Sequence, residues 1–286
     1  MGAVLTSIST FKQALTGGAF EALAAVSGDT LSALFFSADG GAFVEEIVSG
    51  NSTQRMEVAV FSPRFGDNQF GYRAQHMFNP TQAAPVGPPQ WLMPRVLDIP
   101  VFPSDVLNVQ VNAPAGAGNA NVCLQLYYQN VPGAGQRLAS WRQIEAIGWV
   151  RVLGIEVTVT PGATGSPGTA VAINANDARL RANLDYALLG YLTDTSGLAF
   201  RLKGPDTSGF NILLPVSFDA RNTADYFVQQ DIMRSTSVGS MSEGPHIPVI
   251  NSNNAGSTTL DGLAHNNPGA TKVTLILAEM NTPVPV

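Results

Sequence analysis

Charge and cysteine are scarce in this sequence. Charged residues make up 13% of its 286 residues, against about 25% in an average soluble protein. The single cysteine, Cys123, excludes an internal disulfide, and no cysteine–histidine cluster has the spacing of a zinc site. The 15 lysines and arginines form no basic run and the net charge is −6. This composition argues against a protein that follows nucleic acid along its phosphates.

Long apolar runs are also missing. No apolar stretch reaches the roughly 18 residues of a membrane-spanning helix, so we expect none. Lys12 and Gln13 interrupt the N-terminal apolar segment, so we expect no signal peptide. By contrast, the 28 glycines and 19 prolines are spread along the chain without a short period. That distribution favours a fold with many turns over a helical bundle.

Short alternating apolar segments separated by turn residues dominate the chain after Gly28. Turn signals recur every 8–12 residues or so, which is typical of a β-sandwich or barrel and not of βαβ units. We also expect an ordered loop over the proline-rich stretch 79–94. The predicted strands are Leu31–Phe36, Ala42–Val48, Met56–Phe61, Val106–Val111, Val122–Tyr128, Ile155–Thr160, Tyr186–Leu192, Phe200–Lys203, Ile212–Phe218, Ile247–Ile250 and Val273–Ala278.

The N-terminal segment, residues 1–28, has a different pattern. Its apolar residues recur every three or four positions, which predicts a helix over residues 4–26, and Thr10 with Gln13 has the form of a capping box. One interpretation is a helix packed on its own domain. The other is an arm that reaches a neighbouring subunit or a lipid surface. The apolar residues in question are Val4, Ile8, Phe11, Leu15, Ala19, Leu23 and Val26.

The chain also shows weak internal similarity between segments about 150 residues apart. Four blocks recur in the same order, and they predict a duplicated β domain, with two unrelated sandwiches or one large β fold as the alternatives. The resulting halves are residues 29–131 and 150–286. The paired blocks are Ser32–Ile47 with Tyr186–Leu202, Glu57–Phe61 with Leu214–Phe218, Asp98–Val101 with His246–Val249, and Ala120–Leu126 with Thr271–Leu277.

Residues 132–149 link the two halves. Ser140 and Gln143 form a capping-box pattern, and Trp141, Ile144 and Ile147 fall on one helical face. We therefore expect a short linking helix that packs on both halves.

No catalytic, cofactor-binding or metal-binding residue is predicted. Cys123 lies in an alternating strand and is expected to be a buried, inert thiol. Glu45 and Glu46 are adjacent on a strand and face opposite ways, so they cannot flank one sugar. Asp194 and Asp206 each precede Thr-Ser-Gly, which favours an ordinary turn, with a bound hard cation as the alternative. The isolated histidines are His76, His246 and His265.

Two successive β domains, low charge, an amphipathic N-terminal segment, and loops rich in Pro, Gly and Asn together resemble one family. This family is the double jelly-roll major capsid proteins of tailless icosahedral viruses, especially those of membrane-containing bacteriophages. The resemblance covers the whole architecture and rests on no diagnostic motif. It implies two tandem jelly rolls, residues 29–131 and 150–286, after an N-terminal helical arm over residues 1–28.

The resemblance also implies a function. Three chains would form a homotrimeric, pseudo-hexameric capsomer of an icosahedral shell, made in the host cytoplasm and located in the virion. Its partners would be neighbouring capsomers, penton or minor capsid proteins and an internal membrane, without sequence-specific nucleic acid, enzymatic activity or cofactor. The alternatives are a two-jelly-roll glycan-active hydrolase or amidase, and a carbohydrate-binding virion module.

Overall fold

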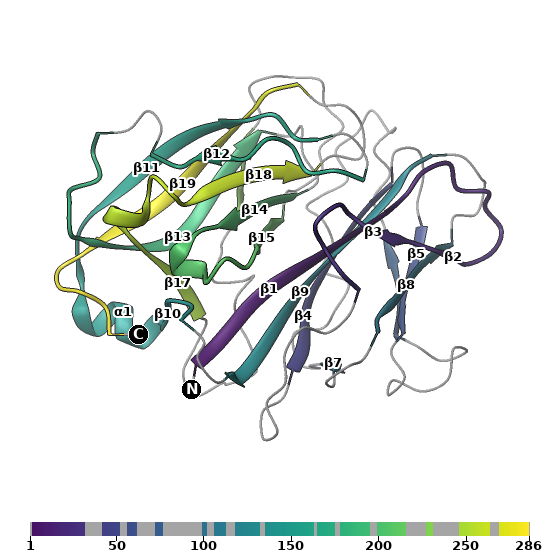
Figure 1. Cartoon of the computed structure of the whole chain (residues 1–286), viewed down its shortest axis with the longest axis horizontal. Coiled ribbons are helices and arrows are strands. Elements are labelled where there is room, and N and C mark those ends of the chain that lie inside the picture. The colour runs from purple at the N-terminus through teal and green to yellow at the C-terminus, as the bar shows by residue number, and fades with distance from the viewer. Residues whose placement is uncertain are drawn as a thin grey trace.

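The computed structural model shows a chain built mainly of antiparallel β-strands (Figure 1). The predicted strands within its described residues are formed, whereas most of Leu31–Phe36, the 79–94 loop and the end of Ile212–Phe218 lie outside them. The prediction of an all-β chain is confirmed. The described residues are 2–31, 42–51, 56–61, 72–76, 99–101, 106–112, 118–131, 135–162, 165–174, 178–194, 199–215, 227–230, 246–263 and 269–285.

The first half of the chain forms two sheets that face each other. One has the strand order β3-β1-β9-β4-β7 and the other the order β2-β8-β5-β6. Their strands are β1 (Gly2–Lys12), β2 (Glu21–Ala22), β3 (Ala24–Ala25), β4 (Ala42–Asn51), β5 (Met56–Phe61), β6 (Tyr72–His76), β7 (Ile99–Val101), β8 (Asn108–Asn112) and β9 (Ala120–Val131).

The second half forms a further pair of sheets. One has the order β10-β17-β13-β19-β11, with β16 also paired to β13, and the other the order β12-β18-β14-β15. The strands are β10 (Leu138–Ser140), β11 (Trp149–Val159), β12 (Val171–Ala172), β13 (Asp185–Asp194), β14 (Ala199–Lys203), β15 (Ile212–Pro215), β16 (Phe227–Gln230), β17 (His246–Asn251), β18 (Thr259–Leu263) and β19 (Thr271–Met280). Two 3-10 turns, η1 (Pro205–Thr207) and η2 (Ser252–Asn254), complete this half.

The two halves share one strand order. The sequence β1-β9-β4-β7 corresponds to β11-β19-β13-β17, and β2-β8-β5-β6 corresponds to β12-β18-β14-β15. Equivalent strands also follow each other in the same order along the chain. The segments containing Ile99 and Ile247 occupy equivalent strands, as do Leu124 and Leu275, in agreement with two of the four repeat blocks.

The other two repeat blocks are wrong by one strand. Phe43 lies on β4, whose equivalent is β13, whereas its expected counterpart Phe200 lies on β14. Likewise, the segment ending at Phe61 is β5, but its expected counterpart at Leu214 belongs to β15, the equivalent of β6. Neighbouring apolar strands of a sandwich have similar compositions, so similarity alone does not fix which strand matches which.

The expected N-terminal helix is also wrong, because Gly2–Lys12 is strand β1 and pairs with β9 along its length. A spacing of four residues fits a helix but equally fits a strand, whose period is two. Val4 and Ile8 therefore share one strand face with Thr6 and Thr10, and these β-branched residues favour a strand. Thr10 forms no helix cap; its Oγ1 donates to the carbonyl of Val122 at 2.8 Å. The first half thus begins with β1 and not at residue 29.

The linking helix is confirmed as α1 (Trp141–Ile147). The backbone N–H of Gln143 donates to Ser140 Oγ at 3.2 Å, and the Ser140 N–H donates to Gln143 Oε1 at 2.7 Å, which completes the capping box. Ile144 is fully buried, and Trp141 and Ile147 pack beside it. The residues of this cluster belong to the linker and the second half, so the described contacts place the helix on the second half alone.

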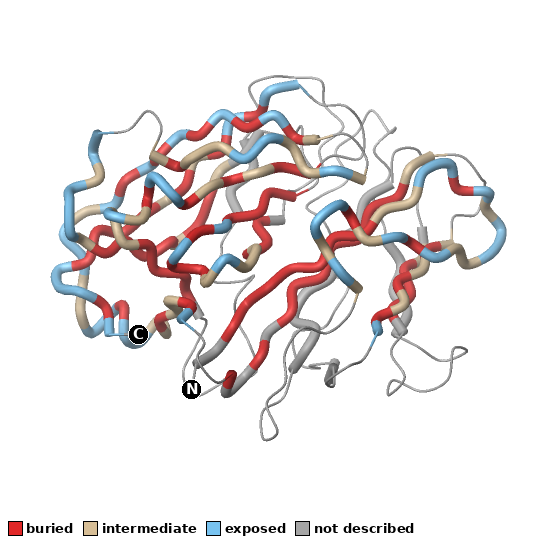
Figure 2. Tube along the Cα trace, in the orientation of Figure 1, coloured by how far each residue is buried: buried red, intermediate tan, exposed pale blue. Residues whose placement is uncertain are grey.

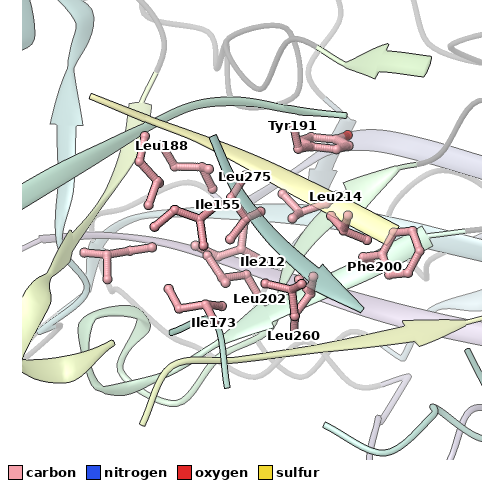
Figure 3. Close-up of a cluster of buried hydrophobic side chains, with 14 of the residues drawn as sticks. Ile155, Ile173, Leu188, Tyr191, Phe200, Leu202, Ile212, Leu214, Leu260 and Leu275 are labelled. Atoms are coloured by element: carbon pink, nitrogen blue, oxygen red, sulfur yellow. The ribbon is translucent and has the colours of Figure 1, made fainter. Parts of the chain in front are cut away.

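Each half has its own hydrophobic core between its two sheets (Figure 2). In the first half the core contains Ile8, Leu126 and Tyr128, all nearly inaccessible to solvent. In the second half it is centred on residues such as Phe200 and Leu275 (Figure 3). Leu126 and Leu275, which lie in matching repeat blocks, are both fully buried.

Candidate functional site: the contact between the two halves

The two halves meet in a buried surface that we call the interhalf contact. On the first half it is made by outward-facing residues of β1 and β9, including Phe11 and Cys123. On the second half it is made by Ala199 of β14, Leu213 of β15 and Leu263 of β18. The strands β1, β9 and β15 run side by side in Figure 1 and are in contact. Cys123 is buried as predicted, but it faces the second half and not the core of its own half.

The free edge of β1 is satisfied within this contact. The N–H groups of Ser7 and Ser9 donate to the carbonyl of Asn211 at 2.8 Å and to Asp29 Oδ2 at 2.7 Å. The N–H of Leu5 donates to the side chain of Gln136, whose Nε2 donates back to the Leu5 carbonyl at 2.9 Å. An uncovered edge strand would offer these groups to another chain. Gln136 of the linker, Asn211 of the second half and Asp29 of the first half instead close the edge.

A buried arginine connects the two halves electrostatically. Arg201 of β14 donates from Nε and Nη2 to the two carboxylate oxygens of Asp261 on β18, at 2.8 and 2.9 Å. Its Nη1 donates to Oδ1 of Asp29, which follows β3, at 3.1 Å. The side chains of Arg201 and Asp29 are each only 4% exposed. The second half therefore supplies the cation for a buried carboxylate of the first half.

Burial and ion pairing act in opposite directions on this group. Burial raises the pKa of the Asp29 carboxyl above its ordinary value, and the charge of Arg201 only partly offsets this effect. Burial also lowers the pKa of Arg201, but its hydrogen bonds and attraction to Asp261 prevail and raise it. Loss of Arg201 would leave Asp29 buried without a compensating charge, so the contact depends on this side chain.

Gly165 marks a close approach at the same contact. Its φ of +91° is a left-handed conformation, and a Cβ at this position would lie 2.5 Å from the ring of Phe11. Its carbonyl also accepts the N–H of Ser27 at 3.2 Å. Only glycine fits this backbone angle and this space. The absence of a side chain at Gly165 lets this loop of the second half lie directly against Phe11 of the first half.

A second polar cluster lies where the linker meets the second half. Arg137 donates to both oxygens of Asp185 at 2.9 Å, and the N–H of Val284 and the side chain of Asn251 donate to the same carboxylate. Burial opposes ionisation of Asp185, but these hydrogen bonds outweigh it and hold the pKa of the carboxyl below its ordinary value. The linker, β13 and the C-terminal segment are fixed together by this group.

A third cluster surrounds Glu279 of β19, whose side chain is inaccessible to solvent. Its Oε2 accepts from Nε of Arg151 at 2.8 Å and from the hydroxyl of Tyr186 at 3.0 Å, while Nη2 of Arg181 lies 2.8 Å from Oε1. Burial raises the pKa of the Tyr186 hydroxyl, which keeps it a donor. The cluster holds β11 and the loop before β13 against β19.

The remaining residues of the sequence analysis do not gather at one site. Asp206 lies in η1, where its oxygens accept from the Asn251 N–H and the Asn254 side chain, both at 2.9 Å. Residues 195–198, after Asp194, lie outside the described residues, as do the side chains of Glu45 and Glu46 and of the histidines. In the part of the chain that the structure describes, no group of three or more His, Cys, Asp or Glu could hold a metal ion.

Sequence reasoning missed Asp29, Arg201, Asp261 and Gln136. One signal was available for Arg201, because an arginine between Phe200 and Leu202 in a charge-poor chain must face away from the core of its sandwich. Its partner Asp29 is 172 positions away along the chain. Only the folded arrangement of the halves could identify that pair.

Comparisons with known proteins assign no family. No protein-family model matches the chain, and no curated protein matches it significantly. Among the described residues, no helix is long and apolar enough to cross a membrane.

Proposed function

We propose that each half is a jelly roll and that the chain is a double jelly-roll protein. Strands β1, β2 and β4–β9 of the first half divide into two four-stranded sets, β1-β9-β4-β7 and β2-β8-β5-β6. In a jelly roll of eight strands, the first, eighth, third and sixth form one sheet and the second, seventh, fourth and fifth the other. The observed order supports this assignment, and the second half repeats it.

We propose further that the protein is a structural virion protein, the major capsid protein of an icosahedral shell. The single observation that carries this proposal is that one chain holds two halves of the same strand order, joined by a buried contact. Three such chains supply six similar lobes, so a threefold ring can occupy a sixfold lattice position. A protein of this kind is a homotrimer whose lateral surfaces are buried against its neighbours.

The chemistry of the described polar groups supports a structural role over an enzymatic one. The carboxylates of Asp29, Asp185, Asp206 and Glu279 are buried, and each accepts hydrogen bonds that connect separate segments of the chain. Each is engaged in holding strands, linker and tails in position. We therefore propose no catalytic activity for this protein.

Neighbouring capsomers, penton or minor capsid proteins and an internal membrane are the proposed partners. The N-terminal segment does not offer its apolar side chains to such a membrane, because Val4, Ile8, Leu15 and Leu23 lie in the first core. A lipid contact would therefore have to use another surface.

The oligomeric state in solution tests this proposal. Size-exclusion chromatography with light scattering should give the mass of three 30.1 kDa chains, about 90 kDa. Electron microscopy of the assembled material should then show closed shells. A stable monomer that hydrolyses a glycan or an amide would overturn the capsid assignment in favour of the enzyme alternative.

A further inference from the structure

We propose that the β11 edge and outer face of the β10-β17-β13-β19-β11 sheet dock a second copy of this chain. The surface of the second copy would be the outer face of its β2-β8-β5-β6 sheet. This inference rests on the proposed trimer and identifies the surfaces that would join its subunits. We call the first the β11 surface, defined by Trp149, Val150 and Val152, and the second the β8 surface, defined by Val106, Asn108 and Gln110.

The β11 surface exposes apolar side chains at a sheet edge. Trp149, Val150 and Val152 are 40%, 59% and 49% exposed. They precede the regular alternation of β11, in which Leu153, Ile155 and the next odd-numbered residues face the core. Large apolar side chains gathered on one exposed strand are typical of a contact surface.

The equivalent strand of the first half shows what covers such a surface. Ile8 of β1 lies opposite Leu124, and Ile155 of β11 lies opposite Leu275 in the equivalent strand pair. Counting back three residues from each isoleucine makes Leu5 the equivalent of Val152. Leu5 is completely buried against residues of the second half, whereas Val152 is half-exposed. The same strand position is therefore covered in one half and open in the other.

The partner face follows from the same comparison. In the interhalf contact, β1 and β9 are covered by the outer face of β14, β15 and β18. The equivalents of these strands in the first half are β5, β6 and β8. On β8, Val109 and Val111 face the core, whereas Asn108 and Gln110 face outward, and Val106 continues the outward positions at 56% exposure. One such pair of faces thus forms the interhalf contact within each chain. The other pair, the β11 surface and the β8 surface, is left for contacts with neighbouring chains.

This arrangement is head-to-tail, because the β11 surface of one chain meets the β8 surface of the next. Head-to-tail contacts form either a closed ring or an open filament. In the proposed trimer the ring is closed by six halves, and the contact between chains then alternates with the similar contact within each chain. A protein of a different sequence would be the other possible occupant of the β11 surface, and the experiment separates the two.

Cysteine labelling in the native assembly tests both surfaces. The single natural thiol, Cys123, is buried and gives little background. The variants are V152C and Q110C, with S257C, in an exposed turn before β18, as the matched control. In the purified trimer, the first two thiols should react slower than the control by about tenfold or more, because modification requires access to the sulfur. Dissociation into monomers should remove the difference.

A charge at the β11 surface supplies an independent readout. V152E should shift the light-scattering mass from three chains to one, while S257E should leave it unchanged. The melting profile of V152E establishes that the monomer is still folded. A purified trimer in which V152C and Q110C react as fast as S257C overturns the inference and leaves the proposed function standing. A wild-type protein that is monomeric overturns the proposed function itself.

Two further outcomes also contradict the inference. If V152C is protected in the trimer but Q110C is not, the β11 surface meets some face other than the β8 surface. If V152C reacts freely in the purified trimer and is protected only after addition of a protein of different sequence, the occupant is that protein and not a second copy.

Discussion

Deleting Gly2–Lys12 should unfold the first half of the protein. Strand β1 is an integral part of that half, since it pairs with β9 along its length and with the two-residue strand β3 near its C-terminal end. Its side chains enter both cores, because Val4 and Ile8 pack in the first and Leu5 in the second. A removable arm would have neither property.

The size of the effect follows from the burial of these side chains. Val4, Leu5 and Ile8 are at most 1% exposed, and full burial of each contributes about 1.5–3 kcal/mol, or about 5–9 kcal/mol together. The total stability of a domain is about 5–15 kcal/mol. The deletion should therefore remove most or all of the stability of the first half, before the lost β-pairing is considered.

Thermal melting and limited proteolysis measure this prediction. The deleted protein should lose its cooperative melting transition, or show it many degrees lower, and residues 13–131 should become protease-sensitive. The variants I8V and I8A should lower the free energy of unfolding by about 0.5–1.5 and 2–5 kcal/mol, respectively. A deleted protein that melts like the wild type would refute the placement of β1 and restore the removable arm.

Three further predictions concern packing and charge. L126A and L275A should each lower the free energy of unfolding by about 2–5 kcal/mol in urea titrations, and a loss below 1 kcal/mol would contradict their burial. R201M should lower the free energy of unfolding by about 3–5 kcal/mol because it leaves Asp29 buried without its cation. D29N keeps an acceptor for the Ser9 N–H and should lower it clearly less. Equal losses in the two variants would argue against the ion pair. Because the pKa of Asp185 is lowered from 3.8 in the folded state, its stabilisation should be complete above that pH and disappear as the pH falls through the folded-state value. In D185N the free energy of unfolding should therefore decrease less steeply as the pH is lowered. The same pH dependence in D185N and the wild type would contradict this assignment.

Local patterns in the sequence predicted the local structure of much of the chain. The alternation around Val58 and Val109 identified strands, and Ser140 with Gln143 identified the start of the only α-helix that the described residues contain. These signals are local, because side-chain alternation and capping depend on residues a few positions apart.

The predictions from sequence were wrong where a local pattern fits two different structures. Val4 and Ile8 are four residues apart, which suits one face of a helix or one face of a strand, and pairing with β9 decides between them. The repeat blocks failed where Phe43 and Phe200 follow alanines on non-equivalent strands. Both ambiguities were resolved by contacts between distant segments.

The interhalf contact could not be predicted, because its members are distant in sequence and individually ordinary. Asp29 alone reads as a turn residue, and Gln136 as part of a polar linker. Their roles appear only when β1 lies against the second half and needs partners for its N–H groups. The equivalence of Leu5 and Val152, on which the docking surface depends, likewise requires the register of both halves.

Electron microscopy of the purified, unassembled protein tests the central claim most directly. The account predicts ring-shaped particles of three chains with six similar lobes around the ring, because each chain contributes two halves of the same strand order. Isolated two-lobed particles with the mass of one chain would contradict it.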